Sequence, residues 1–110
     1  MAFDKALQAG SIEMMLLSLL EKNDMYGYEL IEKIKLKSQG EFELKAGTLY
    51  PLLHLLEQKG YVISYNSDVS RGKPRKYYQI TEEGKIHVRG RVDEWSEYVA
   101  AVERVLGLDS

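Results

Sequence analysis

The sequence predicts an α+β protein that is mostly α-helical, and its 110 residues favour a single folding unit. Three features predict this class. Several stretches repeat apolar residues with the spacing of one helix face, as amphipathic helices do. A pair of short segments rich in tyrosine and β-branched residues predicts a β-hairpin. The last long stretch repeats apolar residues every four and three positions, which is typical of a coiled-coil helix.

The composition excludes several kinds of protein. The chain has no cysteine, which rules out a disulfide framework, a thiolate metal site and a cysteine nucleophile. It has no apolar run near the ~18 residues of a membrane span and nothing typical of a signal peptide, so we expect a cytoplasmic protein. The histidines, His54 and His87, are far apart, and no glycine-rich phosphate loop is present. We expect no catalytic site, metal site or cofactor, and we place His87 on a helix surface.

The net charge of −2 is unevenly distributed along the chain. Residues 45–78 carry six basic and two acidic side chains, whereas residues 1–44 and 79–110 each have three more acidic than basic side chains. A basic centre between acidic flanks is expected of a segment that faces nucleic acid, although a solvated surface has the same pattern.

Two helices are predicted in the N-terminal part. Ser11 is a candidate N-cap for the first, whose apolar positions are Ile12, Met15, Leu16, Leu19 and Leu20. The second runs from Tyr26 to about Ser38, and Gly27 near its start permits a close backbone approach. Tyr26 and Tyr28 flank this glycine, either as packing residues or as phosphate contacts. Residues 41–44 alternate in polarity and predict a short strand.

Residues 45–60, KAGTLYPLLHLLEQKG, predict the helix around which the chain is organised. Its apolar stripe consists of Leu49, Leu52, Leu53 and Leu56. The opposite face has no carboxylate and consists of Gly47, Tyr50, Pro51, His54 and Gln58. Such a face can enter a DNA major groove, although an ordinary amphipathic helix can also present it. Either Thr48 caps this helix and Pro51 falls in its first turn, or the helix begins earlier and bends at Pro51.

A hairpin is predicted after Gly60. Residues 61–65 and 75–80 predict its strands, and residues 66–74 predict a polar loop. Four cations lie at the loop tip and just after it, with no acid among them: Arg71, Lys73, Arg75 and Lys76.

The last predicted helix begins after Thr81, a candidate N-cap, and ends at Gly107. Glu82 and Glu83 lie in its first turn, where the helix dipole favours acids. Its apolar seam consists of Val88, Val92, Trp95, Val99, Val102 and Leu106. A long helix with one narrow seam is expected to pack on the same helix of a second chain; the alternative is packing on its own domain.

Three helices followed by a basic hairpin have the order of a winged helix-turn-helix. We therefore expect residues 1–80 to form a DNA-binding domain and residues 81–110 to form a dimerisation helix. The front of the third helix would read base edges, and Lys45 with the helix N-terminus would anchor the DNA backbone. The hairpin cations would neutralise phosphates or enter a minor groove. A two-fold dimer would contact half-sites about one helical turn apart.

Three motifs carry a resemblance to a known family: MYGYELIEKI, GTLYPLLHLLEQKGYV and RGKPRKYYQITEEGK. From about residue 11 to residue 85, the chain resembles the PadR family of transcriptional regulators, except that Lys45-Ala46 stands where members often have Ser-Pro. The resemblance implies a dimeric winged-helix repressor, not an enzyme, that binds an inverted-repeat operator in double-stranded DNA. It assigns to the DNA interface Tyr26, Gly47, Thr48, Tyr50, Pro51, His54, Arg71, Lys73, Arg75 and Lys76.

The single terminal helix resembles the short PadR subfamily, and WSEYVAAVERVL resembles the terminal helix of its multidrug-sensing members. This resemblance implies an apolar pore at the dimer centre, where Trp95 of each subunit stacks on a planar aromatic ligand. The expected neighbours of that ligand are Val92, Val99, Leu7 and Met14. The alternatives are a ligand-independent repressor, in which Trp95 only packs, and a winged-helix protein–protein interaction module.

Overall fold

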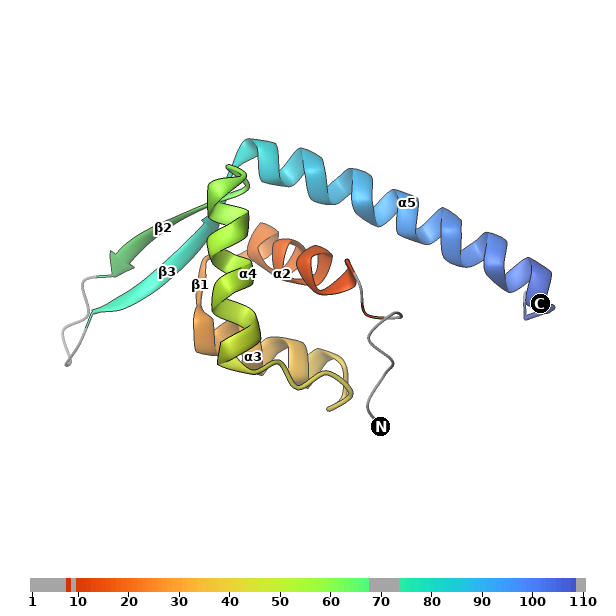
Figure 1. The fold of residues 1–110 in the computed structure, drawn as a ribbon, viewed down its shortest axis with the longest axis horizontal. Helices are drawn as coiled ribbons and strands as arrows, with labels where there is room; N and C mark the ends of the chain where they lie inside the picture. The colour runs from red at the N-terminus through yellow and green to blue at the C-terminus, as the bar shows by residue number, and fades with distance from the viewer. Residues whose placement is uncertain (1–7, 9, 68–73, 109–110) are drawn as a thin grey trace.

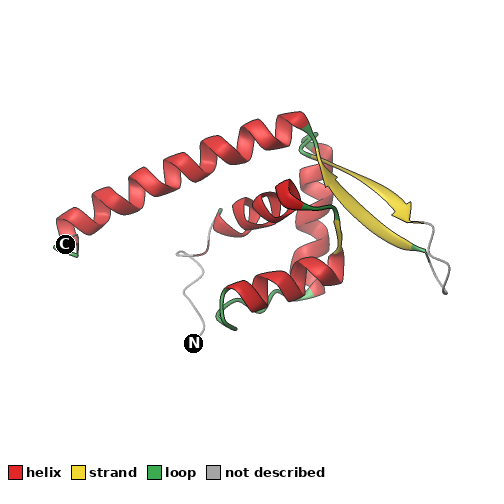
Figure 2. Ribbon diagram, turned by 180° about the vertical axis from the view of Figure 1, so that it is seen from behind, coloured by secondary structure: helices red, strands yellow, loops and turns green. Residues whose placement is uncertain are grey.

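The computed structural model describes residues 8, 10–67 and 74–108, and it confirms the mostly helical α+β class. The helices are α2 (Ser11–Lys22), α3 (Gly27–Lys37), α4 (Ala46–Gln58) and α5 (Glu82–Leu106). The strands are β1 (Met25–Tyr26), β2 (Val62–Ser67) and β3 (Arg75–Ile80). They form one antiparallel sheet in the order β1-β3-β2, beside the three shorter helices (Figures 1 and 2). This is the arrangement of a winged helix-turn-helix, as the sequence predicted.

One hydrophobic core joins the helices to the sheet. The predicted apolar stripes supply most of it, and its fully buried side chains are Leu16, Leu17, Leu20, Leu30, Leu49, Leu53, Leu56, Val62 and Val88. Tyr78 and Ile80 of β3 close the core on the side of the sheet. The core therefore holds α4 and the hairpin in one fixed relation.

Three local predictions were wrong. The N-cap of α2 is Gly10, with φ +80°, and the Ser11 hydroxyl instead donates to the Gln8 carbonyl oxygen at 2.9 Å. Residues 41–44 form no strand, because the place beside β3 in the sheet is taken by β1, which the sequence did not predict. Strand β2 continues to Ser67 because it pairs with β3 as far as Arg75, inside the stretch predicted as loop.

Helix α5 begins and ends as predicted, and only its first part lies on the rest of the chain. Thr81 Oγ1 accepts the Gly84 N–H at 3.0 Å, and Gly107 ends the helix in the left-handed conformation. Val88 is buried against the core, and Arg89 pairs with Glu21 of α2 at 2.8 Å between Nη2 and Oε2. The last turns of α5 extend past the other described elements toward the C-terminus (Figure 1).

Gly84 lies where α5 begins beside the start of the hairpin. A Cβ at position 84 would overlap the Tyr61 carbonyl oxygen and would lie 2.7 Å from Ile80 Cγ1. We expect Gly84→Ala to lower the free energy of unfolding by about 1–3 kcal/mol, because backbone and a buried side chain must move. Gly90→Ala in the same helix meets no atom within 4 Å and should raise it by about 0.5–1 kcal/mol. Chemical denaturation measures both, and equal changes would contradict this packing.

Candidate nucleic-acid interface

Helix α4 has one buried face and one exposed face. Its leucine stripe is buried, with Leu52 half-buried at the edge. The exposed face includes Gly47, Thr48, Tyr50, Pro51, His54 and Gln58, together with Leu55, which is 41% exposed. The only carboxylate of the helix, Glu57, is half-buried and accepts a hydrogen bond from the Ser64 hydroxyl at 2.7 Å. The exposed face therefore presents polar groups without negative charge.

Helix α4 begins before its proline. Its N-cap is Lys45, whose carbonyl oxygen accepts the N–H groups of Thr48 and Leu49, each at 2.9 Å. The alternative in which Thr48 caps the helix is therefore wrong, and the earlier start is right. Because Pro51 lies inside the helix without an N–H, the Gly47 carbonyl lacks its usual partner four residues on. A Cβ at position 47 would meet no atom within 4 Å, so this turn is open to approach.

Three exposed cations lie at the start of α4 and at the start of β3. Lys45 at the start of α4 and Arg75 and Lys76 at the start of β3 make no ion pair with a described residue. Arg75 Cζ lies 4.5 Å from the centre of the Tyr26 ring, and Lys76 Nζ lies 5.7 Å from the centre of the Tyr78 ring. The other two predicted hairpin cations, Arg71 and Lys73, lie outside the described residues.

A hollow of about 350 Å³ lies where Arg75 and Lys76 meet Tyr50 of α4. It is lined by Tyr26, Gly27, Tyr28, Tyr50, Arg75 and Lys76. The side chain of Tyr50 extends from α4 to Gly27, so a Cβ at position 27 would overlap the Tyr50 hydroxyl. The expected close approach at Gly27 is therefore confirmed, and its partner is Tyr50. The structure thus brings together predicted site residues from β1, α4 and β3, namely Tyr26, Tyr50, Arg75 and Lys76.

Tyr26 is a packed residue rather than a free one. Its half-buried ring makes a T-shaped contact with the Tyr77 ring, with centroids 5.4 Å apart and planes at 66°. Tyr77 in turn stacks on Tyr65, with centroids 5.8 Å apart and planes at 18°. The Tyr65 hydroxyl donates to Asp24 Oδ2 at 2.6 Å, and this hydrogen bond is the main reason that the pKa of Tyr65 is raised. Tyr28, in contrast, is exposed.

The Asp24–Tyr65 contact predicts a change in tyrosine titration. Asp24→Ala should lower the pKa of Tyr65 toward its ordinary value of 10.0, because the lost hydrogen bond favours the neutral phenol. The folded chain holds this proton more tightly than the unfolded chain does. The contact therefore stabilises the fold fully below pH 10.0, and the stabilisation is lost as the pH rises through the raised pKa.

Ultraviolet difference titration at the tyrosinate band measures this pKa. Tyr65→Phe removes the step that belongs to Tyr65 and so identifies it. A titration curve that is the same with and without Asp24 would contradict the assignment.

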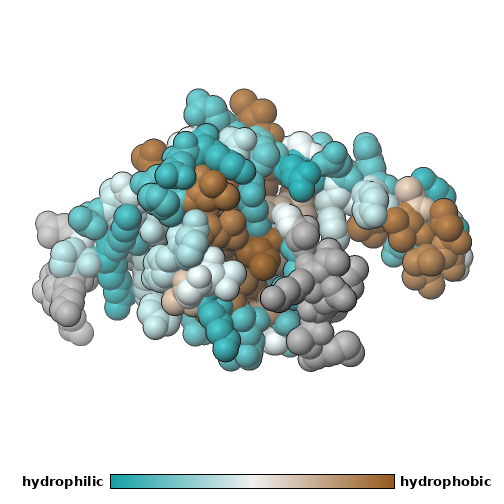
Figure 3. Space-filling view, viewed as in Figure 1, coloured by the Kyte–Doolittle hydropathy of each residue, from teal (hydrophilic) through white to brown (hydrophobic). Residues whose placement is uncertain are grey.

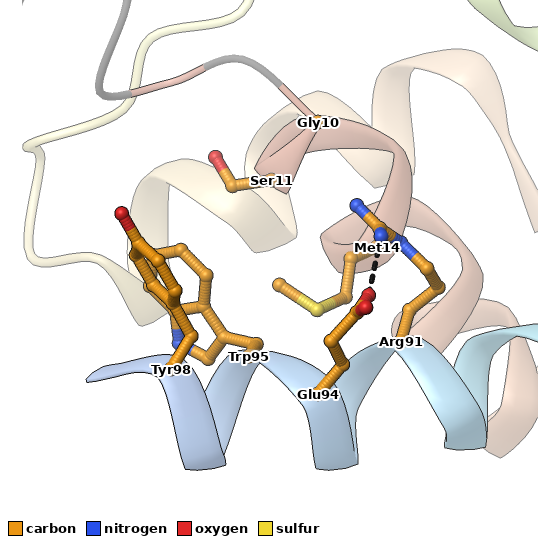
Figure 4. Close-up of a pocket in the computed structure, with 7 residues that line it drawn as sticks. All are labelled: Gly10, Ser11, Met14, Arg91, Glu94, Trp95 and Tyr98. Carbon is orange, nitrogen blue, oxygen red and sulfur yellow. Dashed lines mark hydrogen bonds and ion pairs between the residues drawn. The ribbon is translucent and has the colours of Figure 1, made fainter. Parts of the chain in front are cut away.

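A second candidate site lies between α2 and α5. Trp95 and Met14 line two hollows there. One, of about 330 Å³, contains the ion pair of Arg91 Nη1 with Glu94 Oε1 at 2.7 Å (Figure 4). The other, of about 420 Å³, extends along α2 to α3 and includes Val92. Of the remaining predicted ligand residues, Val99 is half-buried and lines neither hollow, and Leu7 lies outside the described residues.

His87 is not the helix-surface residue that the sequence predicted. Its half-buried ring stacks on Tyr61 at 4.2 Å, and its Nε2 lies 3.1 Å from Glu13 Oε1. These contacts join α5 to α2 and to the turn before β2, and no local pattern marks residues so far apart as neighbours. Within residues 8, 10–67 and 74–108, no group of three His, Asp or Glu side chains is placed to hold a metal ion.

Known proteins share this sequence and this fold. Residues 16–89 match the Transcriptional regulator PadR-like family. Uncharacterized protein X of Lysinibacillus sphaericus is 39% identical over 88 residues, which are 80% of this chain and 81% of that protein. A transcriptional regulator from Clostridium thermocellum has a solved structure with 30% identity and a TM-score of 0.85, covering 94% of this chain and 97% of its own. A PadR family regulator from Clostridium difficile R20291 has 38% identity and a TM-score of 0.73, covering 88% and 98%.

No helix in the described part of the chain combines the length and hydropathy that crossing a membrane requires. PadR family members regulate transcription and are not enzymes. The family match spans more than half of the sequence and agrees with the winged fold, so this chain belongs to the PadR-like family of DNA-binding transcriptional regulators.

Proposed function

We propose that the protein is a dimeric repressor that binds an inverted-repeat operator through α4 and the hairpin. The observation that carries the proposal is the concave surface where the exposed face of α4 meets Arg75 and Lys76. None of its lining residues is acidic, and neither cation is neutralised by a described carboxylate. We expect the regulator to act in the cytoplasm, with the DNA that it controls.

Each proposed contact follows from side-chain chemistry. Tyr50 and His54 both donate and accept hydrogen bonds, which suits them to base edges in the major groove. Lys45 and the N-terminus of α4 attract a phosphate. Arg75 and Lys76 neutralise flanking phosphates, together with Arg71 and Lys73 of the hairpin loop. The small or compact residues on the same face, Gly47, Thr48 and Pro51, allow the helix backbone to approach the DNA.

The outer part of α5 supports the dimer. Its exposed apolar side chains are Trp95, Tyr98, Val102, Val105 and Leu106, and the exposed Leu108 follows the end of the helix. Figure 3 shows hydrophobic surface at the far end of this helix. At about 100° per residue, the apolar side chains from Trp95 to Leu106 cover a wider arc of the helix surface than a two-stranded coiled-coil seam does. Helix α5 should therefore contact more than one element of a second copy.

The apolar hollow between α2, α3 and α5 fits such a partner helix. Lys22 and Lys37 line this hollow and make no ion pair with a described residue. Glu97 and Glu103 border the apolar arc of α5 on either side, so a partner helix laid in the hollow brings opposite charges together. On this basis residues 81–110 form the dimerisation helix and residues 1–80 the DNA-binding domain.

We also propose that a planar aromatic ligand binds at Trp95. The indole is 46% exposed, and a second copy seated on the seam would cover the hollows beside it. Met14, Val92 and Val99 supply apolar neighbours, with Leu7 of the N-terminal segment. A ligand there would change how α5 lies on α2 and thereby the spacing of the two α4 helices, which releases the operator.

Two substitutions separate phosphate contact from base reading. Arg75→Ala should weaken binding to every duplex and lower the slope of log affinity against log salt by about one, because one phosphate contact is lost. His54→Ala should instead reduce the preference for operator over random duplex, with the slope unchanged. Fluorescence anisotropy at several salt concentrations measures both, with duplexes from upstream of its own gene and of random sequence.

Lys59→Ala is the matched control, because this exposed cation lies at the other end of α4. It should leave both the slope and the preference unchanged. An unchanged slope in Arg75→Ala would argue against the phosphate contact. Equal losses on both duplexes in His54→Ala would argue against base reading.

The ligand proposal predicts a fluorescence response, because Trp95 is the only tryptophan. Planar aromatic cations at micromolar concentration should quench its emission and weaken operator binding. Trp95→Leu keeps the seam apolar, so it should remain dimeric in sedimentation and bind the operator without responding to the ligand. Quenching that is absent at high micromolar concentrations would favour a ligand-independent repressor.

A further inference from the structure

Tyr26 is held between two partners. The edge-to-face contact with Tyr77 fixes one side of its ring, and the Arg75 guanidinium lies 4.5 Å over the ring centre. That distance is within the range of a cation–π interaction, in which arginine is attracted to an aromatic face. The ring of Tyr26 therefore holds the Arg75 guanidinium over its face by a cation–π contact.

Tyr26 belongs to a row of tyrosine rings that crosses all three strands. Tyr26 and Tyr65 are each directly opposite Tyr77 in the sheet register, so the three rings form one row on one face. The neighbouring pairs, Met25 and Ser64 with Tyr78, point to the other face, where Met25 and Tyr78 enter the core. The hydrogen bond from Tyr65 to Asp24 ties the end of the row to the residue before β1.

Arg75 needs a contact of this kind if its guanidinium is to act at a defined position. Its long side chain is exposed and has no ion-pair partner among the described residues, so its rotamers would otherwise be free. A guanidinium stacked on a ring still has its N–H groups available in its own plane to donate to a phosphate. The contact thus restrains the cation without neutralising its charge.

We propose that Tyr26 is a positioning residue for Arg75 rather than a direct DNA contact, and that Tyr77, Tyr65 and Asp24 hold Tyr26 in place. This inference rests on the proposed DNA-binding role of Arg75. It assigns to the ring of Tyr26, and not to its hydroxyl, the contribution of this residue to DNA binding.

The geometry is tested first without DNA. In the NMR spectrum of the full chain, the side-chain Hε of Arg75 should carry a ring-current shift from Tyr26. Tyr26→Phe keeps the ring and should retain the shift, whereas Tyr26→Leu and Tyr26→Met should abolish it. Lys76, which lies over Tyr78 instead, should keep its side-chain shifts in all three variants. An Arg75 resonance unaffected by loss of the ring would overturn the proposal.

The role in binding is tested by a double-mutant cycle on the slope of log affinity against log salt. Tyr26→Leu should weaken duplex binding by about two- to fivefold at ~0.1 M salt and lower the slope, whereas Tyr26→Phe should match the wild type. Tyr26→Leu should have no further effect when Arg75 is already alanine. Combined with Lys76→Ala, the matched control, its effect should be undiminished.

Two outcomes would overturn this assignment. If Tyr26→Phe weakens binding as much as Tyr26→Leu, the hydroxyl contacts the DNA directly. If Tyr26→Leu weakens binding equally in the Arg75→Ala background, the ring acts independently of Arg75.

If Arg75→Ala itself leaves affinity and slope unchanged, the proposed phosphate contact fails, while the ring-current result still reports on the Tyr26–Arg75 geometry. Tyr26→Met repeats the cycle if Tyr26→Leu does not fold.

Discussion

The burial of one leucine stripe fixes how the molecule presents its proposed DNA surface. Leu49, Leu53 and Leu56 are fully buried in the core that also contains Leu30 of α3 and Tyr78 of β3. Because successive residues of a helix turn by about 100°, burying these leucines forces the opposite face of α4 outward along its whole length. The same core holds the hairpin beside α4. The concave surface formed by α4 and the hairpin is therefore held in place by this core.

Charge is distributed according to position in the fold. Three of the four cations of α5 have a carboxylate partner: Lys85 pairs with Glu82, Arg89 with Glu21 and Arg91 with Glu94. Arg75 and Lys76 instead lie on tyrosine rings, which restrain a cation without cancelling its charge. The positive potential is thus kept where phosphates are proposed to bind, in a chain whose net charge is negative.

Periodicity predicted the elements and much of the surface, and tertiary contacts account for what it missed. The helical stripes, the Thr81 cap and the exposed face of α4 follow from local spacing, so the sequence was sufficient for them. Strand β1 has two residues and exists only because β3 pairs with it. The contact of His87 with Glu13 joins residues 74 positions apart, which no local pattern reports. For Tyr26 the local sequence left packing and phosphate contact open, because its ring partner Tyr77 lies on a strand far along the chain.

The central claim is that the exposed face of α4 and the start of β3 together form the DNA-contacting surface. The most direct measurement is an NMR titration of the ¹⁵N-labelled chain with a duplex from upstream of its own gene. We expect the backbone amides of Gly47, Thr48, Tyr50, His54, Arg75 and Lys76 to shift, while those of the buried stripe of α2 stay in place. Shifts confined to other surfaces, with these amides unchanged, would contradict the account.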